Sequence, residues 1–193
     1  MECPILIEDE AEGAEPVVLE TESGTRVECE GLSGSGKYTG LKTVGEVSTT
    51  FTGCEVGETG IKCTSPGAVE GEIKPAALKG ELGVIKTEGK AVNNEIGIDL
   101  APESGSTAAQ FKCAFASITV TGSIIHEVVT NRMLASESEK FLQKNGQQRP
   151  EKFEGQPADV LYSQLGESEP EQAGEGLLSK LKNEEKMEVN STI

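Results

Sequence analysis

The chain has 193 residues, enough for one domain with a hydrophobic core, and its formal net charge is -16. Such an acidic protein repels nucleic-acid phosphates, so we expect it to bind no nucleic acid. No run of about 18 to 20 apolar residues is present, so we also expect no membrane insertion.

Residues 1–24 form the first predicted segment. Between Met1 and Glu30 the chain has ten carboxylates and a single base, Arg26. A segment with this imbalance is expected to be partly mobile and solvated. We therefore predict an acidic N-terminal segment at 1–24, followed by a single β-rich domain at 25–193.

Short β-branched runs, separated by Gly, Thr, Ser, Asn or Pro, predict strands through most of the chain. Ile118, Val120 and Ile124 alternate with Thr and Ser, which is typical of a strand with one buried face. The candidate strands are 16–19, 25–28, 44–51, 60–64, 68–73, 78–86, 94–100, 109–115, 117–125 and 187–193. They predict an all-β sandwich or barrel of about 8–10 mostly antiparallel strands. With no Trp, its core must be mainly aliphatic.

The composition changes after Asn131, where Gly becomes sparser. Glu, Gln and Lys are common in 133–142 and 177–188, and their propensity predicts minor helical content toward the C-terminus. The leucines of the second stretch also fit an edge strand. Between these stretches, Gly and Pro residues predict a long loop at 147–175 with one short turn at 158–164.

Four cysteines, Cys29, Cys54, Cys63 and Cys113, lie among the predicted strands and are our disulfide candidates. Cys54 and Cys63 are nine residues apart with two glycines between them, which suits a bridged hairpin and would leave Cys29 to pair with Cys113. Every connectivity among the four stays open. Cys3 is left over, as a tail thiol or a link to another chain.

The same cysteines could be metal ligands, but no C-x-x-C pair exists and His126 is the only histidine. No calcium loop accompanies the acidic residues. We therefore expect no metal and no other cofactor. Since disulfides rarely persist in a reducing cytosol, we expect an extracellular or cell-surface protein whose leader has been removed before Met1.

Residues 31–37 match the G-x-x-x-x-G-K core of a phosphate-binding loop. Tyr38 follows, where such a loop needs Ser or Thr to hold magnesium, and the next residues favour a strand rather than a helix. We interpret the match as a flexible turn between two strands.

His126 would have to be the centre of any Ser–His–Asp arrangement. It lies in an apolar stretch, and no G-x-S-x-G elbow is present, so we interpret it as a strand histidine rather than a general base. Glu72, Glu81, Glu95 and Asp99 lie on predicted strands and are available acids for a two-carboxylate glycan hydrolase. Carboxylates are so numerous here that this pattern is not specific, and we assign no catalytic residue.

Six short segments together carry a family resemblance: 38–44, 50–54, 62–67, 78–83, 150–155 and 183–185. Through them the chain resembles a group of uncharacterised exported proteins of actinobacteria, over about residues 25–190. The resemblance implies an extracellular β-rich domain and no catalytic residues. This chain departs from the group in lacking a leader and in its acidic front end.

These observations predict a non-enzymatic secreted or cell-surface structural or binding module, with a protein or glycan as its partner. One alternative is a secreted glycan hydrolase that uses two carboxylates. Another is a carrier of a small apolar ligand in a β-barrel, which would show as a closed cavity lined by Ile and Val.

Overall fold

A computed structural model describes residues 3–9, 16–87, 94–129 and 133–187 of the chain. This part is all-β, without a helix. Its strands are β1 (Cys3–Asp9), β2 (Val17–Thr21), β3 (Arg26–Cys29), β4 (Gly31–Tyr38), β5 (Thr43–Thr52), β6 (Glu55–Val56), β7 (Cys63–Thr64), β8 (Leu78–Lys86), β9 (Glu95–Pro102), β10 (Thr107–Cys113), β11 (Ala116–Thr121), β12 (Ile124–Val128), β13 (Leu134–Lys144), β14 (Gln147–Arg149), β15 (Lys152–Phe153), β16 (Gln156–Pro157), β17 (Leu161–Leu165) and β18 (Glu171–Met187).

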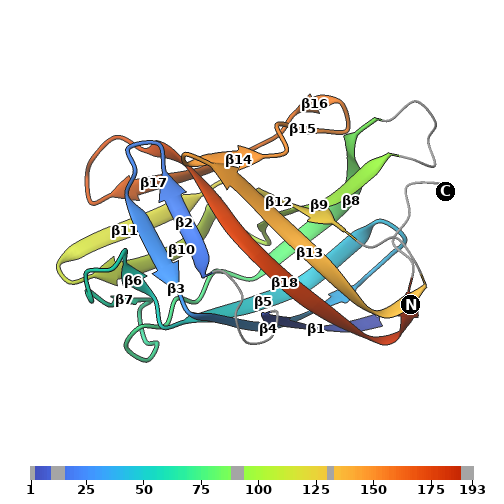
Figure 1. The fold of residues 1–193 in the computed structure, drawn as a ribbon, viewed down its shortest axis with the longest axis horizontal. Coiled ribbons are helices and arrows are strands. Elements are labelled where there is room, and N and C mark those ends of the chain that lie inside the picture. Colours follow the sequence, from blue (N-terminus) through green and yellow to red (C-terminus); the bar gives the residue numbers. More distant parts are fainter. Residues whose placement is uncertain (1–2, 10–15, 88–93, 130–132, 188–193) are drawn as a thin grey trace.

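Eight antiparallel strands close into a barrel in the order β1, β4, β5, β8, β9, β12, β13 and β18 (Figure 1). The closing pair is β13 with β18, in which Glu139 lies opposite Ser179. On the other side β18 pairs with β1, where Ile7 lies opposite Leu181. The prediction of an all-β fold of mostly antiparallel strands is confirmed, and of the two architectures that the sequence left open, a sandwich or a barrel, the structure has the barrel.

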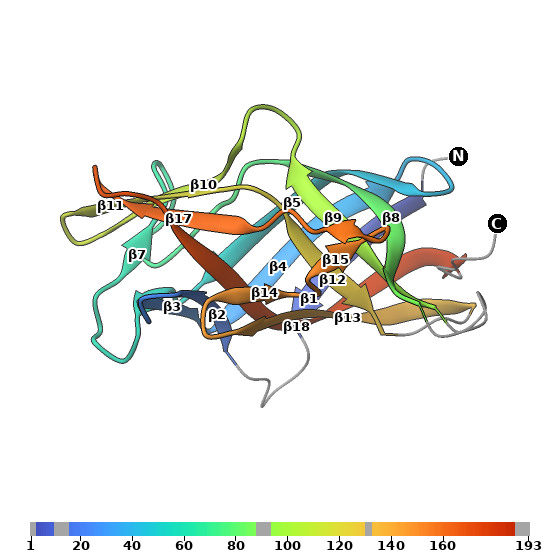
Figure 2. The ribbon, with the colours of Figure 1, turned by 90° about the horizontal axis from the view of Figure 1, so that it is seen from above.

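The first half of β18 belongs to a second sheet beside the barrel, with the order β6, β3, β2, β18, β17, β11, β10 and β7. A bridge between Glu55 and Lys62 connects β6 to the start of β7, so this sheet also returns on itself. Figure 2 shows it at one end of the barrel, with β18 running through both parts. One long strand therefore joins the two halves of the molecule.

The predicted strand 117–125 is divided between the two halves at Gly122. β11 lies in the second sheet and β12 in the barrel. Gly122 has φ +98°, and a Cβ atom there would lie 2.0 Å from the carbonyl oxygen of Val160. Only glycine fits this crossing point, because other residues rarely adopt that φ and would collide with the neighbouring backbone.

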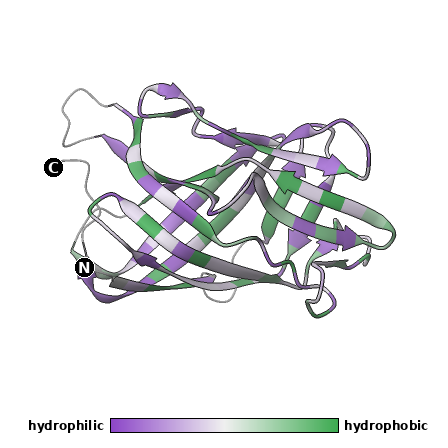
Figure 3. Cartoon of the chain, turned by 180° about the vertical axis from the view of Figure 1, so that it is seen from behind, coloured by the Kyte–Doolittle hydropathy of each residue, from purple (hydrophilic) through white to green (hydrophobic). Residues whose placement is uncertain are grey.

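The barrel and the second sheet share one continuous core, to which Ile98, Phe111, Val120 and Leu181 all belong. From Ile98 to Pro102 in β9 and from Leu177 to Asn183 in β18, buried residues alternate with exposed or half-buried ones. Figure 3 shows the same alternation as hydrophobic and hydrophilic bands across the strands. Period-two patterning thus places the aliphatic residues inside, as expected for closed antiparallel sheets.

The prediction of helical content toward the C-terminus is wrong. Residues 133–142 and 177–188 fall largely in β13 and β18, which pair with each other. In β13, Glu137, Glu139 and Phe141 are buried while Ser138 and Lys140 between them are more exposed. Barrel closure gives both strands hydrogen-bonded neighbours on each side, and this tertiary pairing outweighs the helical propensity of Glu, Gln and Lys.

The N-terminal segment contributes strands to both halves of the molecule. β1 lies between β4 and β18 in the barrel, with Ile5 buried, and β2 pairs with β3 and β18. Residues 10–15 lie outside the described part of the chain. Along β1 the buried Ile5 and the half-buried Ile7 lie on either side of the exposed Leu6, because alternate residues of a strand face opposite sides.

Three other segments differ from their predicted form. Residues 147–175, expected to be a long loop, hold β14 to β17 and the start of β18. Residues 31–37, interpreted as a turn, lie within β4 between two barrel strands. Residues 68–73 form turns with an isolated bridge at Ile73 instead of a strand. Of the last candidate strand, Met187 ends β18 and 188–193 lie outside the described residues.

Candidate functional site

A cavity of about 130 Å³ lies inside the molecule where the barrel meets the second sheet. Its lining comes from both halves and is predominantly aliphatic. Barrel residues in the lining include Val47, Leu78 and Leu100, and residues of the second sheet include Val120 and Leu161.

Small side chains contribute to this space. Gly36 of β4, Thr49 of β5 and Ala109 of β10 all line the cavity. The interior of an eight-stranded barrel is just wide enough either to be filled by side chains or to hold one small ligand. With no Trp in the chain and small residues at these positions, the interior is not completely filled.

The most unusual member of the lining is Glu175 of β18. It projects inward like Ala173 and Leu177 on the same face of the strand, and it is half-buried. No described residue donates a hydrogen bond to its carboxylate or forms an ion pair with it. Desolvation raises the pKa of Glu175 to about 7.

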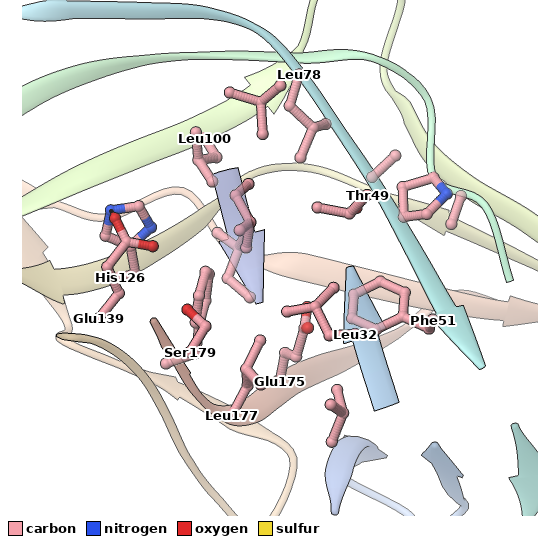
Figure 4. A pocket seen from close by; sticks show the side chains of 18 of the residues that line it. Leu32, Thr49, Phe51, Leu78, Leu100, His126, Glu139, Glu175, Leu177 and Ser179 are labelled. Atoms are coloured by element: carbon pink, nitrogen blue, oxygen red, sulfur yellow. Dashed lines mark ion pairs between the residues drawn. The ribbon is translucent and has the colours of Figure 1, made fainter. Parts of the chain in front are cut away.

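A second polar group in the lining is the pair of His126 and Glu139, which lies beside a later part of β18 than Glu175 does. Nε2 of His126 on β12 lies 2.8 Å from Oε1 of Glu139 on β13, with side chains 4% and 6% exposed. The contact lacks the directionality of a hydrogen bond, and Nδ1 of His126 has no hydrogen-bond partner among the described residues. The ring also meets Phe141 edge-on, at 5.0 Å between centroids. Figure 4 shows this pair apart from Glu175.

Ser179 lies opposite Glu139 and is fully buried in the same lining. Its hydroxyl has no hydrogen bond to His126 or to any other described residue. A serine nucleophile needs a hydrogen bond to its histidine base. The three side chains are therefore not arranged as a catalytic triad, which agrees with our interpretation of His126 as a strand histidine.

The barrel interior beyond the cavity holds one more carboxylate, Glu137. Asn183 Nδ2 donates a hydrogen bond of 2.5 Å to Glu137 Oε1, and both residues are buried. Burial raises the pKa of Glu137 to about 7, and the charge of Glu139 acts in the same direction. Glu137 does not line the cavity.

All four candidate cysteines form disulfides, but not as a bridged hairpin. Cys29 is bonded to Cys54, and Cys63 is bonded to Cys113. The N–H of Cys63 donates a hydrogen bond of 2.9 Å to the carbonyl of Cys54, so these two are backbone neighbours. Cys63 lies directly opposite Cys113 in the β7–β10 ladder, which decides the pairing. The side chain of Cys3 lies outside the described part of the structure.

The four acids named for a glycan hydrolase do not meet in the cavity. Glu72 forms an ion pair with Lys74, and Glu95 forms one with Lys86. Glu81 and Asp99 lie opposite each other on the outside of the barrel. Burial raises the pKa of Asp99, and nearby carboxylates raise it further.

Neither Glu139 nor Glu175 was singled out from the sequence. Glu175 stands among glycines before a run of leucines, and only an alternating pattern through 173–181 would have placed it on the inner face. The composition of that stretch predicts loop and helix, for which an alternating pattern has no meaning. The alternation through 173–181 places Glu175 on the inner face only if this stretch is known to be a strand.

In the described part of the chain, no three His, Cys, Asp or Glu residues are grouped so that they could hold a metal ion. The same residues contain no helix of the length and apolarity needed to cross a bilayer. Comparison with protein-family models, curated proteins and solved structures found no match to this chain. The interior cavity is therefore the basis for assigning a function.

Proposed function

We propose that this protein is a non-enzymatic binding module that holds one small, mostly apolar molecule in the cavity between its barrel and its second sheet. The observation that carries the proposal is the mainly aliphatic cavity of about 130 Å³ with an unpaired carboxylate in its lining. Ligand sites of small molecules combine such an apolar wall with a few polar groups.

The size of the cavity limits the ligand. An engineered apolar cavity of about 150 Å³ binds benzene or xenon, so this one suits a molecule of about five to seven non-hydrogen atoms. An empty space of this size costs about 3 kcal/mol of stability at roughly 24 cal/mol per Å³. A bound apolar molecule would recover part of that free energy through its contacts with the wall.

We further propose that the module acts outside the cytosol, either secreted or at the cell surface. Its support is the pair of buried disulfides, Cys29–Cys54 and Cys63–Cys113, since such bonds rarely persist in a reducing compartment. The resemblance to exported proteins of actinobacteria points the same way.

The test is binding of benzene and cyclopentane, followed through the methyl resonances of cavity residues in NMR spectra. We expect saturable shifts of the methyl groups of Val47, Leu78 and Leu100. Ala109→Leu adds a side chain to the cavity wall and should abolish the shifts. Gln110→Leu also introduces a leucine, but one residue away on the exposed face, and it should leave the shifts of the methyl resonances intact.

If neither hydrocarbon shifts these resonances in the unchanged protein, the proposal is wrong. It is equally wrong if Ala109→Leu folds and still binds as the unchanged protein does. Turnover of glycans, peptides or esters by the pure protein would instead favour an enzyme.

A further inference from the structure

We infer that the ligand is a small apolar amine, whose ammonium group forms an ion pair with the carboxylate of Glu175 inside the cavity. This inference rests on the proposed function and adds the chemical class of the ligand. It starts from the position of Glu175: this half-buried side chain lines the cavity, and no described residue is its partner.

A carboxylate in such surroundings destabilises the folded protein unless something pairs with it, because burying an unpaired charge costs several kcal/mol. A leucine or isoleucine would fill the same inward position of β18 without that cost. The described residues that line the cavity include no Lys or Arg. No cationic side chain among the described lining residues therefore neutralises Glu175, and a cationic ligand can do so.

The other titratable groups in the lining are Tyr38, His126 and Glu139. Glu139 already has His126 at 2.8 Å. It lies opposite Ser179, four residues along β18 from Glu175, a separation of roughly 13 Å along a strand. His126 therefore cannot serve as the counter-ion of Glu175, which leaves the two polar sites of the cavity independent.

The surroundings of Glu175 suit an organic cation better than a hydrated metal ion. Leu32 and Phe51 line the same cavity as Glu175, and all three are labelled in Figure 4. An aliphatic wall stabilises the hydrocarbon part of an amine, and the face of an aromatic ring attracts its ammonium group. The net charge of -16 also draws cations, rather than anions, toward the protein.

The test compares cyclopentylamine with cyclopentanol and cyclopentane, which share one ring and differ in charge and polarity. We expect the amine to bind at least about tenfold more tightly than the alcohol at pH 8, because a charged hydrogen-bonded pair forms only with the amine. Glu175→Gln keeps the shape of the side chain and should remove this preference while cyclopentane still binds. Glu137→Gln changes a buried carboxylate outside the cavity and should keep the preference.

A second measurement needs no variant and applies even if Glu175→Gln fails to fold. The carboxyl carbon resonance of Glu175 reports its titration in the unchanged protein. Saturating cyclopentylamine should lower the midpoint by about 1–3 pH units, as an opposite charge at contact does. Cyclopentanol should leave the midpoint unchanged.

The outcomes separate the two proposals. Binding of cyclopentane without a preference for the amine, or a preference that survives Glu175→Gln, overturns the amine inference and leaves the binding function standing. An unchanged Glu175 midpoint in saturating amine overturns it as well. Failure of all three compounds to bind overturns the proposed function and this inference together.

Discussion

His126 and Glu139 form a buried pair within the barrel, with Nε2 of the ring 2.8 Å from Oε1 of the carboxylate. They come from adjacent strands and are diagonal neighbours, since His126 lies opposite Phe141. Both line the cavity, whose wall is predominantly aliphatic. The stability of this part of the barrel should therefore depend on both residues together.

Removing one member of the pair should be costly. We expect Glu139→Leu or His126→Leu to lower the free energy of unfolding by about 3 kcal/mol, because each leaves a buried polar group alone. The double variant should cost clearly less than the sum of the two single variants. Urea unfolding measures all three, with the exposed Glu184→Gln as a control. Additive losses would mean that the two side chains are not coupled.

The disulfides should each stabilise the fold according to the loop that they close. The loop of Cys29–Cys54 has a sequence separation of 25 and that of Cys63–Cys113 one of 50. Replacing a pair by serines should lower the free energy of unfolding by about 3.5 kcal/mol and about 4 kcal/mol, respectively.

Peptide mapping of the unreduced protein checks the connectivity directly. It should recover one fragment that joins Cys29 to Cys54 and another that joins Cys63 to Cys113. A fragment joining Cys54 to Cys63 would contradict the structure, since that pairing is the bridged hairpin considered from the sequence.

Stability should fall as the pH rises from about 4.5 to about 7, in part because of Glu137. Burial raises its pKa from 4.5 to about 7, so in this range the folded protein holds a proton that the unfolded chain has released. The stabilisation is complete below the unfolded pKa and is lost as the pH rises through the folded pKa. Its total is roughly 3 kcal/mol.

Glu137→Gln isolates this contribution because the amide does not titrate. The free energy of unfolding of the unchanged protein minus that of the variant should fall as the pH rises from about 4.5 to 7. Outside this range the difference should stay constant. The exposed Glu184→Gln should show no such window. A pH-independent difference for Glu137→Gln would contradict the raised pKa.

Enlarging the cavity should both destabilise the protein and change what it can hold. Leu100→Ala removes a buried wall residue and should lower the free energy of unfolding by about 2–5 kcal/mol. Leu6→Ala, at an exposed position of β1, should cost less than about 0.5 kcal/mol. If the cavity is the ligand site, the Leu100→Ala protein should bind toluene more tightly than the unchanged protein does, as the same NMR titration measures.

The strands that could be predicted are those whose local pattern is unambiguous. Residues 78–86 were predicted as a strand with the bounds of β8, and 44–51 fall within β5. Both are rich in β-branched or alternating apolar residues between turn residues. β4 could not be found in the same way, because its glycines and serines resemble a turn until neighbouring strands are seen to pair with it on both sides.

Most residues of the site could not be predicted from the sequence for the same reason. His126 is the single histidine of the chain and is therefore an evident candidate. Its partner Glu139 is one of many carboxylates and lies in a stretch with helical propensity. Glu175 lay at the end of a predicted loop. Their common position inside the barrel follows from the β13–β18 pairing, which no local pattern indicates.

The sequence alone determined the all-β class, the acidic character and the four cysteines that form disulfides, because period-two patterning, charge and cysteine count are local or compositional properties. Only the tertiary structure decided which cysteines pair, that 133–142 and 177–188 are strands, and that Glu175 faces an apolar cavity. These features depend on partners far apart in the chain. Closing the barrel selects the register, and the register determines which face of each strand lies inside.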